Sequence, residues 1–156
     1  MIVKLEQIRP LRPDDWITLT AFFEALSDTD RAFFHPHPFD AATAKIICGS
    51  DRDVFVAGFE DGRIEAYGML RGWADGYEVP RLGLATRPEA RGCGWAEAMM
   101  TYLHRVAAEK GATRVELKVN SDNTAAQRLY RRFDYQFDEH SGSAGELIGR
   151  RELECA

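Results

Sequence analysis

The chain has 156 residues, of which 45% are hydrophobic and 29% charged, and its formal net charge is −5. This balance is typical of a globular protein, and we expect residues 1–156 to form a single domain. No apolar run approaches the roughly 20 residues that span a bilayer, and no basic stripe marks a nucleic-acid surface, so we expect neither partner. The N-terminal stretch lacks the pattern of a signal peptide, which favours a cytoplasmic protein.

The first half of the chain alternates between strand and helix patterns. The apolar and β-rich stretch at 3–11 predicts a strand, and apolar residues at helical spacing predict a helix over 13–28. Two prolines favour a loop over 27–39. A short helix is expected over 40–49, with Asp40 as its cap and Gly49 as its end.

The second half begins with a hairpin pattern. Two β-rich runs, 53–59 and 63–73, flank Asp61-Gly62, a pair that accepts the positive φ angles of a type I′ turn. The patterns that follow predict a strand over 79–86, a helix over 95–111, a strand over 113–119, a helix over 120–133 and weaker strands around 134–139 and 146–153. In the strand over 113–119, apolar residues alternate with charged ones, which predicts one buried face.

A small-residue loop joins the strand over 79–86 to the helix over 95–111. Its sequence is Arg91, Gly92, Cys93, Gly94, Trp95 and Ala96. Glycines let the unpaired N–H groups of a helix start approach an anion, so the loop suits a phosphate. Glu97 breaks the dinucleotide fingerprint GxGxxG, and no P-loop sequence is present. A tight turn that needs glycine for its geometry alone is the other interpretation.

A second block supplies the context for this loop, with Asn123, Ala126, Leu129 and Tyr130 followed by Asp134-Tyr135. Together the two blocks resemble the GNAT-type N-acetyltransferase family, whose signatures are Arg/Gln-x-x-Gly-x-Gly/Ala and Asn-x-x-Ala-x-x-Leu-Tyr-x-x-x-Gly-Phe. Asp134-Tyr135 replaces the usual Gly-Phe, although Asp tolerates a left-handed turn. The resemblance implies an α/β single-domain GNAT-like fold with a mixed, mostly antiparallel sheet flanked by helices and splayed between strands 4 and 5.

The resemblance also implies acetyl-CoA as the co-substrate. Its pantetheine arm is expected to lie between the splayed strands, against the backbone of Leu84, Ala85 and Thr86. The pyrophosphate is expected on the N–H groups from Arg91 to Ala96. Asn123 and Ala126 are expected to line the same gap, and Asn123 alternatively serves only as a helix cap.

Acetyl transfer to a primary amine needs an acid and a base. The family places at Tyr130 a tyrosine that protonates the departing thiolate, and a core role is the alternative. The fourth strand carries no carboxylate in its centre, and Glu78 at its start is the nearest base, unless it is only a solvated turn residue. Proximity alone also supplies much of such a rate.

The acceptor-binding wall is expected in the region that contains Phe34, His35 and His37, with Tyr77 flanking it. The alternatives are a packed, proline-fixed loop and a His-x-His metal site. Further ligands at sensible spacing are not evident, and the three cysteines lack paired spacing, so no metal is expected. The acceptor is a small-molecule amine or a peptide, and a homodimer stays open. A sensor that binds acetyl-CoA without turnover and a nucleotide-binding module are the competing functions.

Overall fold

A sheet of seven strands, ordered β1-β2-β3-β4-β5-β7-β6, forms the centre of the computed structural model. The structure describes residue 3, residues 5–138 and residues 145–154. The strands are β1 (Ile8–Pro10), β2 (Val54–Glu60), β3 (Arg63–Arg71), β4 (Arg81–Thr86), β5 (Arg114–Asn120), β6 (Gln136–Asp138) and β7 (Glu146–Glu152). Neighbouring strands are antiparallel except for the parallel pair β4 and β5. The expected mixed, mostly antiparallel sheet is therefore confirmed.

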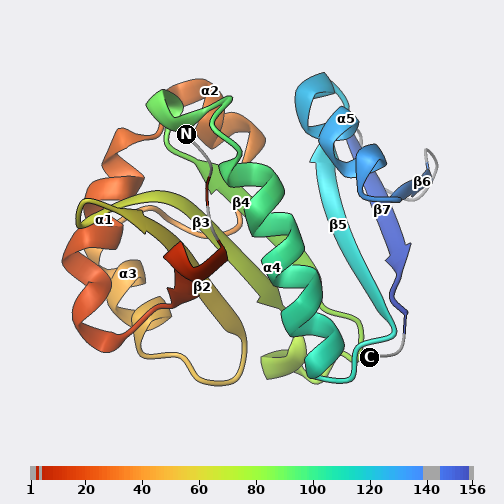
Figure 1. Ribbon diagram of the computed structural model, residues 1–156, viewed down its shortest axis with the longest axis horizontal. Helices are drawn as coiled ribbons and strands as arrows, with labels where there is room; N and C mark the ends of the chain where they lie inside the picture. Colours follow the sequence, from red (N-terminus) through yellow and green to blue (C-terminus); the bar gives the residue numbers. More distant parts are fainter. Residues whose placement is uncertain (1–2, 4, 139–144, 155–156) are drawn as a thin grey trace.

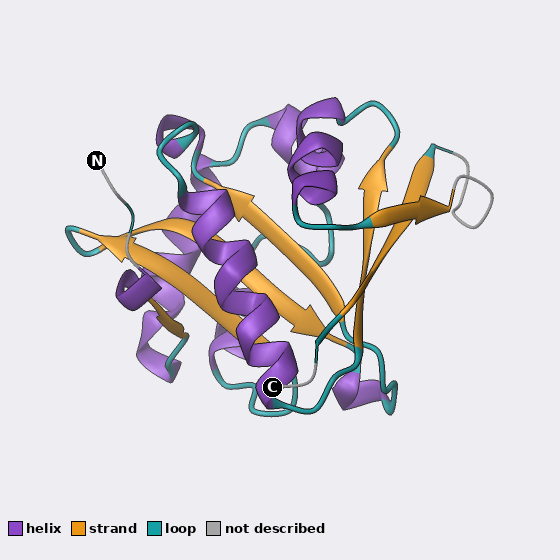
Figure 2. Cartoon of the chain, turned by 45° about the vertical axis from the view of Figure 1, so that its right-hand side comes forward, coloured by secondary structure: helices purple, strands orange, loops and turns teal. Residues whose placement is uncertain are grey.

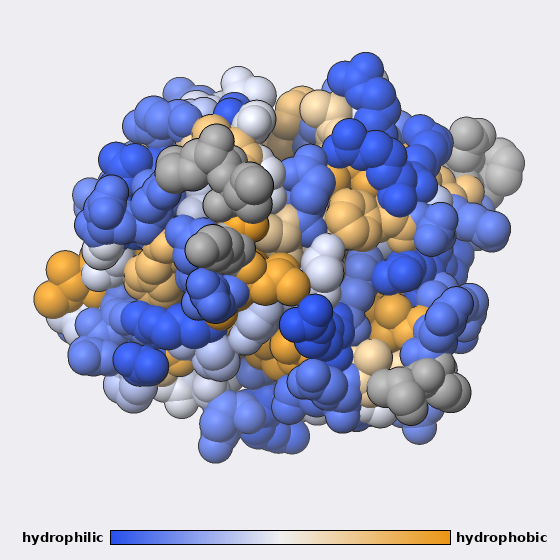
Figure 3. Space-filling model, viewed as in Figure 1, coloured by the Kyte–Doolittle hydropathy of each residue, from blue (hydrophilic) through white to orange (hydrophobic). Residues whose placement is uncertain are grey.

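Helices cover both faces of this sheet (Figure 1). They are α1 (Trp16–Ala25), α2 (Asp28–Phe33), α3 (Ala41–Cys48), α4 (Trp95–Glu109) and α5 (Thr124–Arg132). One core cluster joins α4 and α5 to the sheet and includes Met99 and Leu129, while the other joins α1 and α3 to it and includes Phe22 and Tyr67. No described helix is long and apolar enough to cross a membrane. On the face that carries α4, apolar residues lie in small separate groups among hydrophilic ones (Figure 3).

Local sequence signals set the hairpin and the third helix as predicted. Asp61 and Gly62 have φ angles of 52° and 75°, the left-handed values of the expected turn between β2 and β3. The side chain of Asp40 accepts the N–H of Thr43 at 2.8 Å and so caps the start of α3. Gly49 ends this helix.

Two expectations for the N-terminal third are wrong. The stretch 3–11 forms a strand only over Ile8–Pro10, because Leu5–Gln7 makes a turn of 3₁₀ helix. The expected loop over 27–39 contains α2. A reciprocal capping box stabilises the start of this helix, with Ser27 and Asp30 each accepting the other's backbone N–H.

Strands β4 and β5 diverge soon after they begin. Their register contains one residue pair, Arg81 with Glu116, and the Glu116 N–H donates to the carbonyl of Pro80 at 3.0 Å. On its other side β4 pairs with β3 along its whole length, and β5 pairs with β7. Figure 2 shows β4 and β5 opening as a V from this shared start. The splay between strands 4 and 5 is therefore confirmed.

The C-terminal elements follow the predicted order. Asp134 adopts a φ of 67° directly after α5, so it makes the left-handed turn for which glycine is the usual residue. β6 and β7 occupy the two weaker strand patterns. Residue 139, at the end of the first of these patterns, lies outside the described residues.

The close approach of α4 to β2 supplies a test of the fold. A Cβ added to Gly58 would overlap the ring of Trp95, a residue that is 2% exposed. Gly58→Ala should lower the free energy of unfolding by about 1–3 kcal/mol, as overpacking does, measured by urea denaturation. Gly49→Ala is the control, because its Cβ would meet only ordinary contacts at 3.5 Å or more. Equal stability of the two variants would contradict this packing.

Candidate functional site

The small-residue loop presents a row of free backbone donors. Gly92 and Gly94 have φ angles of 75° and 91°, and α4 begins at Trp95. Among the described residues, no carbonyl accepts the N–H groups from Gly92 to Glu97, and the ladder of α4 starts with the N–H of Ala98 donating to Gly94. The positive φ angles fit a tight turn, and the free donors at a helix start fit an anion. The loop can therefore cradle a phosphate.

Arg91 links this loop to α2. Its guanidinium forms an ion pair with Asp30, whose side chain is 11% exposed. Burial raises the pKa of Asp30, but hydrogen bonds from Ser27 and Arg91 outweigh it, and the net pKa lies below the usual value. The Asp30 carboxylate stays ionised at neutral pH and holds the Arg91 side chain beside the loop.

The free edge of β4 lies next to the loop. Leu84, Ala85 and Thr86 use one edge of the strand to pair with Gly68, Tyr67 and Ala66 of β3. Their other edge faces the opening toward β5, where the register contains no partners for them. An extended ligand with amide groups can pair with such an edge as an added strand.

Helix α5 carries three of the predicted site residues, Asn123 at its N-cap and Ala126 and Tyr130 within it. Asn123 Oδ1 accepts the N–H of Ala126 at 3.2 Å, so Asn123 caps the helix, as the alternative interpretation expected. Tyr130 is 7% exposed, and no other described residue hydrogen-bonds its hydroxyl. Burial raises its pKa to about 12, which keeps the phenol protonated and able to donate a proton.

A buried pair behind Tyr130 escaped the sequence analysis. His104 Nε2 and Tyr135 Oη lie 2.7 Å apart, and the Tyr135 ring packs against Tyr130 with ring centres 5.8 Å apart. Burial lowers the pKa of His104 to about 4, so its ring is neutral. The tyrosine that replaces the usual phenylalanine was the only sequence signal of this pair.

A pocket of about 1020 Å³ lies beside the open edge. Phe34 and His35 line it from the segment after α2, and Tyr77 and Glu78 line it from the loop between β3 and β4. These four predicted residues are therefore brought together. Glu78 is exposed and has no ion pair within the described ranges. Its carboxylate can approach a proton on a ligand in this pocket.

His37 lies apart from the pocket lining. Its Nδ1 is 2.8 Å from the carbonyl of Pro38, and its Nε2 is 2.9 Å from the hydroxyl of Tyr67. Because a carbonyl can only accept, Nδ1 carries the proton and Nε2 accepts from Tyr67. The ring also packs against Phe23 and Phe39. His37 therefore packs behind the residues that line the pocket. Within the described residues, no group of three acidic, cysteine or histidine residues that could hold a metal contains it.

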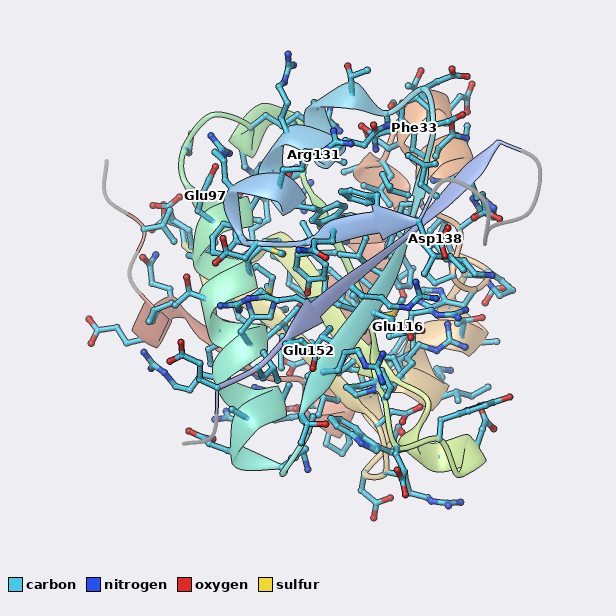
Figure 4. The ribbon with its side chains drawn as sticks, turned by 90° about the vertical axis from the view of Figure 1, so that its right-hand side faces the viewer. Phe33, Glu97, Glu116, Arg131, Asp138 and Glu152 are labelled. Atoms are coloured by element: carbon cyan, nitrogen blue, oxygen red, sulfur yellow. The ribbon has the colours of Figure 1, made fainter. Side chains whose placement is uncertain are left out.

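Charged residues on the sheet form part of the same pocket. Arg71 of β3, Arg81 of β4 and both Glu116 and Lys118 of β5 line it. The alternation in β5 predicted a buried face correctly, but its charged face borders a pocket. Figure 4 shows Glu116 on the same side of the sheet as Phe33 of α2, another lining residue, and opposite Glu97 of α4.

Comparisons with known proteins agree with this geometry. Residues 19–135 match the sequence pattern of the Acetyltransferase (GNAT) family. An acetyltransferase of Sodalis glossinidius is 28% identical over 104 residues, which span 67% of this chain and 69% of the relative. An acetyltransferase of Pectobacterium atrosepticum is 29% identical over 102 residues, 65% of this chain and 71% of the relative.

Solved structures share the fold. The GNAT domain of S. lividans PAT has a TM-score of 0.84 at 20% identity, covering 94% of this chain and 89% of that one. A phosphinothricin acetyltransferase from Sinorhizobium meliloti, solved with AcCoA, has a TM-score of 0.76 at 15% identity, with 94% and 87% covered. The PaiA N-acetyltransferase of Thermoplasma acidophilum, solved with coenzyme A, has a TM-score of 0.74 at 14% identity, with 94% and 98% covered.

The burial of His104 makes stability depend on pH. The pKa of His104 is about 4 in the folded protein and about 6.5 in an unfolded chain. The unfolded chain binds more protons between these values, so stability falls as the pH drops through this window. His104→Gln should flatten this part of the fall in urea midpoint between pH 7 and pH 5. His35→Gln, which removes an exposed histidine, should keep the wild-type slope. An unchanged slope in His104→Gln would refute the low pKa assigned to His104.

Proposed function

Because the chain belongs to the GNAT acetyltransferase family, we propose that it transfers the acetyl group of acetyl-CoA to a primary amine of a small molecule or peptide. The observation that carries this proposal is the opening between β4 and β5, with free strand groups along β4 and free N–H groups at the start of α4. The edge of β4 fits a pantetheine arm, and the N–H groups at the start of α4 fit a pyrophosphate. Acetyl-CoA carries both groups in one molecule.

The residues present fit acetyl-CoA. The N–H groups of Gly92, Cys93, Gly94, Trp95 and Ala96 would hold the pyrophosphate at the positive end of α4. The N–H of Arg91, also expected to bind it, donates instead to the carbonyl of Pro88 at 3.4 Å. Backbone groups of Leu84, Ala85 and Thr86 would pair with the amides of pantetheine, with Asn123 and Ala126 on the other side. Acetyl-CoA supplies an acetyl thioester, which is activated toward attack by a neutral amine.

Two side chains would move the protons. Glu78 would accept a proton from the attacking amine, since its exposed carboxylate borders the acceptor pocket. The new C–N bond forms as the C–S bond breaks, and the electron pair of that bond leaves on sulfur. Tyr130 would donate its phenol proton to this thiolate, a role that its buried and protonated state supports. Phe34, His35 and Tyr77 would form the wall against which the acceptor lies, with His37 behind it.

The loop can be tested with two valine variants of the same helix. Gly94→Val should abolish acetyl-CoA binding, because a side chain in the loop blocks the approach of phosphate. Gly111→Val is the control. Its φ of 86° imposes similar strain, but it lies at the other end of α4. The measurement is a thermal melt with and without excess acetyl-CoA, with ATP and NAD as comparison ligands.

A ligand at 100 times its dissociation constant stabilises a protein by about 2.7 kcal/mol. Wild type and Gly111→Val should show this shift with acetyl-CoA, and Gly94→Val should not. A normal shift in Gly94→Val would reduce the loop to a tight turn. A shift of the wild type with ATP or NAD instead would favour a nucleotide-binding module.

Tyr130 can be tested by removing its hydroxyl. Tyr130→Phe should lower kcat by about 10²-fold, the lower end of the range for general acid catalysis, with little change in KM for acetyl-CoA. Release of free CoA thiol measures the rate. Tyr102→Phe removes a half-buried hydroxyl from a different helix, α4, and should keep the wild-type rate. An unchanged kcat in Tyr130→Phe would remove the assigned role. Binding of acetyl-CoA without transfer to any amine would favour the sensor.

A further inference from the structure

Two arginines face each other on the floor of the acceptor pocket. Arg71 of β3 and Arg81 of β4 are directly opposite in the antiparallel register, and both line the pocket. Like charges placed directly opposite each other on neighbouring strands are destabilising. This pair therefore needs negative charge from nearby.

Within the described residues, direct ion pairs supply little of that charge. Arg71 donates to the carbonyl of Pro36 at 2.8 Å, and no carboxylate of the described residues lies within 4.0 Å of its guanidinium. In the described part of the chain, the carboxylate that pairs with Arg81 is that of Glu116, at 4.0 Å. Glu116 is also paired with Arg150, at 3.3 Å. Of the carboxylates that the structure describes, Glu116 therefore pairs with Arg81 and is shared with Arg150, and none pairs with Arg71.

We propose that Arg71 and Arg81 bind a carboxylate of the acceptor, which makes the acceptor an amine that also carries a carboxylate, as amino acids do. This inference rests on the proposed acetyl transfer and names the class of its acceptor. A guanidinium presents its donors in a planar fork that matches a carboxylate in two parallel hydrogen bonds. The bond from Arg71 to Pro36 holds one such fork in place.

The position of the pair along the strands fits this acceptor. Met69 and Gly83 are paired two residues along from Arg71 and Arg81, at the start of the β4 edge proposed to hold pantetheine. Two residues of an antiparallel strand span about 7 Å. A carboxylate on the arginines therefore leaves the amine of a short amino acid within reach of that edge.

Acidic residues around the pocket favour binding of the ammonium group of an amino acid. Asp75, Glu78 and Glu146 line the pocket, and no ion pair joins them to other residues in the part of the chain that the structure describes. They attract an ammonium group before it loses its proton. They also repel a doubly charged anion, which favours a carboxylate over a phosphate on the arginine pair.

The experiment compares matched acceptors. A panel of α- and ω-amino acids is assayed with acetyl-CoA, each next to its carboxamide and its aminophosphonate, and CoA thiol release gives kcat/KM. At least one amino acid should exceed its carboxamide by about tenfold or more, the size of a charge-assisted hydrogen bond. Arg71→Gln should raise the KM for that acid toward the value for the amide. Arg71→Lys should lose less, because it keeps the charge without the fork.

The control is Arg105→Gln, on the exposed side of α4, which should keep the wild-type preference. Folding of each variant is checked by thermal melting, and acetyl-CoA should still raise the melting temperature of Arg71→Gln. Equal kcat/KM for acids and amides would overturn the inference and leave the acetyl transfer standing. A preference for the aminophosphonate would overturn the carboxylate assignment.

A binding measurement covers the case in which no amine is acetylated. That result would count against the proposed function. Carboxylate binding by Arg71 and Arg81 is then tested by thermal melting of the protein saturated with CoA. N-acetyl amino acids should raise its melting temperature more than their amides do, and less so in Arg71→Gln. Equal shifts for acids and amides would overturn the inference by themselves.

Discussion

The divergence of β4 from β5 is the constraint on which the rest of the molecule depends. The strands share one residue pair, after which the β4 edge presents backbone donors and acceptors inside a sheet of seven strands. Unpaired backbone groups away from water are costly, so such an edge is stable only where water or a ligand can reach it. An amide-bearing arm laid along this edge satisfies those groups in the way that a missing strand would. The open edge therefore ties the architecture of the sheet to ligand binding.

Helix α4 sets the position of the candidate phosphate loop relative to that opening. Its first residue, Trp95, packs into the space that Gly58 leaves on β2, and this contact fixes the start of the helix relative to the sheet. The loop before it is tied in turn to α2 by the pair of Arg91 with Asp30. The last residue of α2, Phe33, lines the acceptor pocket. One ion pair thus connects the candidate phosphate loop with the wall of the acceptor pocket.

Local chemistry made much of this predictable from the sequence. The turn at Asp61-Gly62 and the glycines at 92 and 94 depend on local backbone conformation, and the Asp40 cap depends on a side chain three residues from its partner, so these patterns predicted the observed turns and helix starts. One error overlooked a local signal. Two prolines suggested a loop over 27–39, but the Ser27–Asp30 capping box stabilises α2. The other misreadings arose where tertiary structure decides the outcome. The charged side of β5 has the alternation of a solvent-facing strand, and only the position of α2 shows that it borders a pocket. His37 carried no sequence signal that separated a pocket residue from one packed against Tyr67.

The departure from the family signature at Asp134-Tyr135 is explained by the structure around it. Asp134 adopts the left-handed turn, so the chain leaves α5 in the direction that glycine would allow. Tyr135 brings a hydroxyl into the core, and an unpaired hydroxyl there would destabilise the fold. His104 on α4 lies 2.7 Å from it and is neutral, so its Nε2 can pair with the phenol. The result is a hydrogen bond between α4 and the segment after α5, next to the ring of Tyr130. The altered motif therefore holds the proposed acid in place, and it gives no reason to regard the site as inactive.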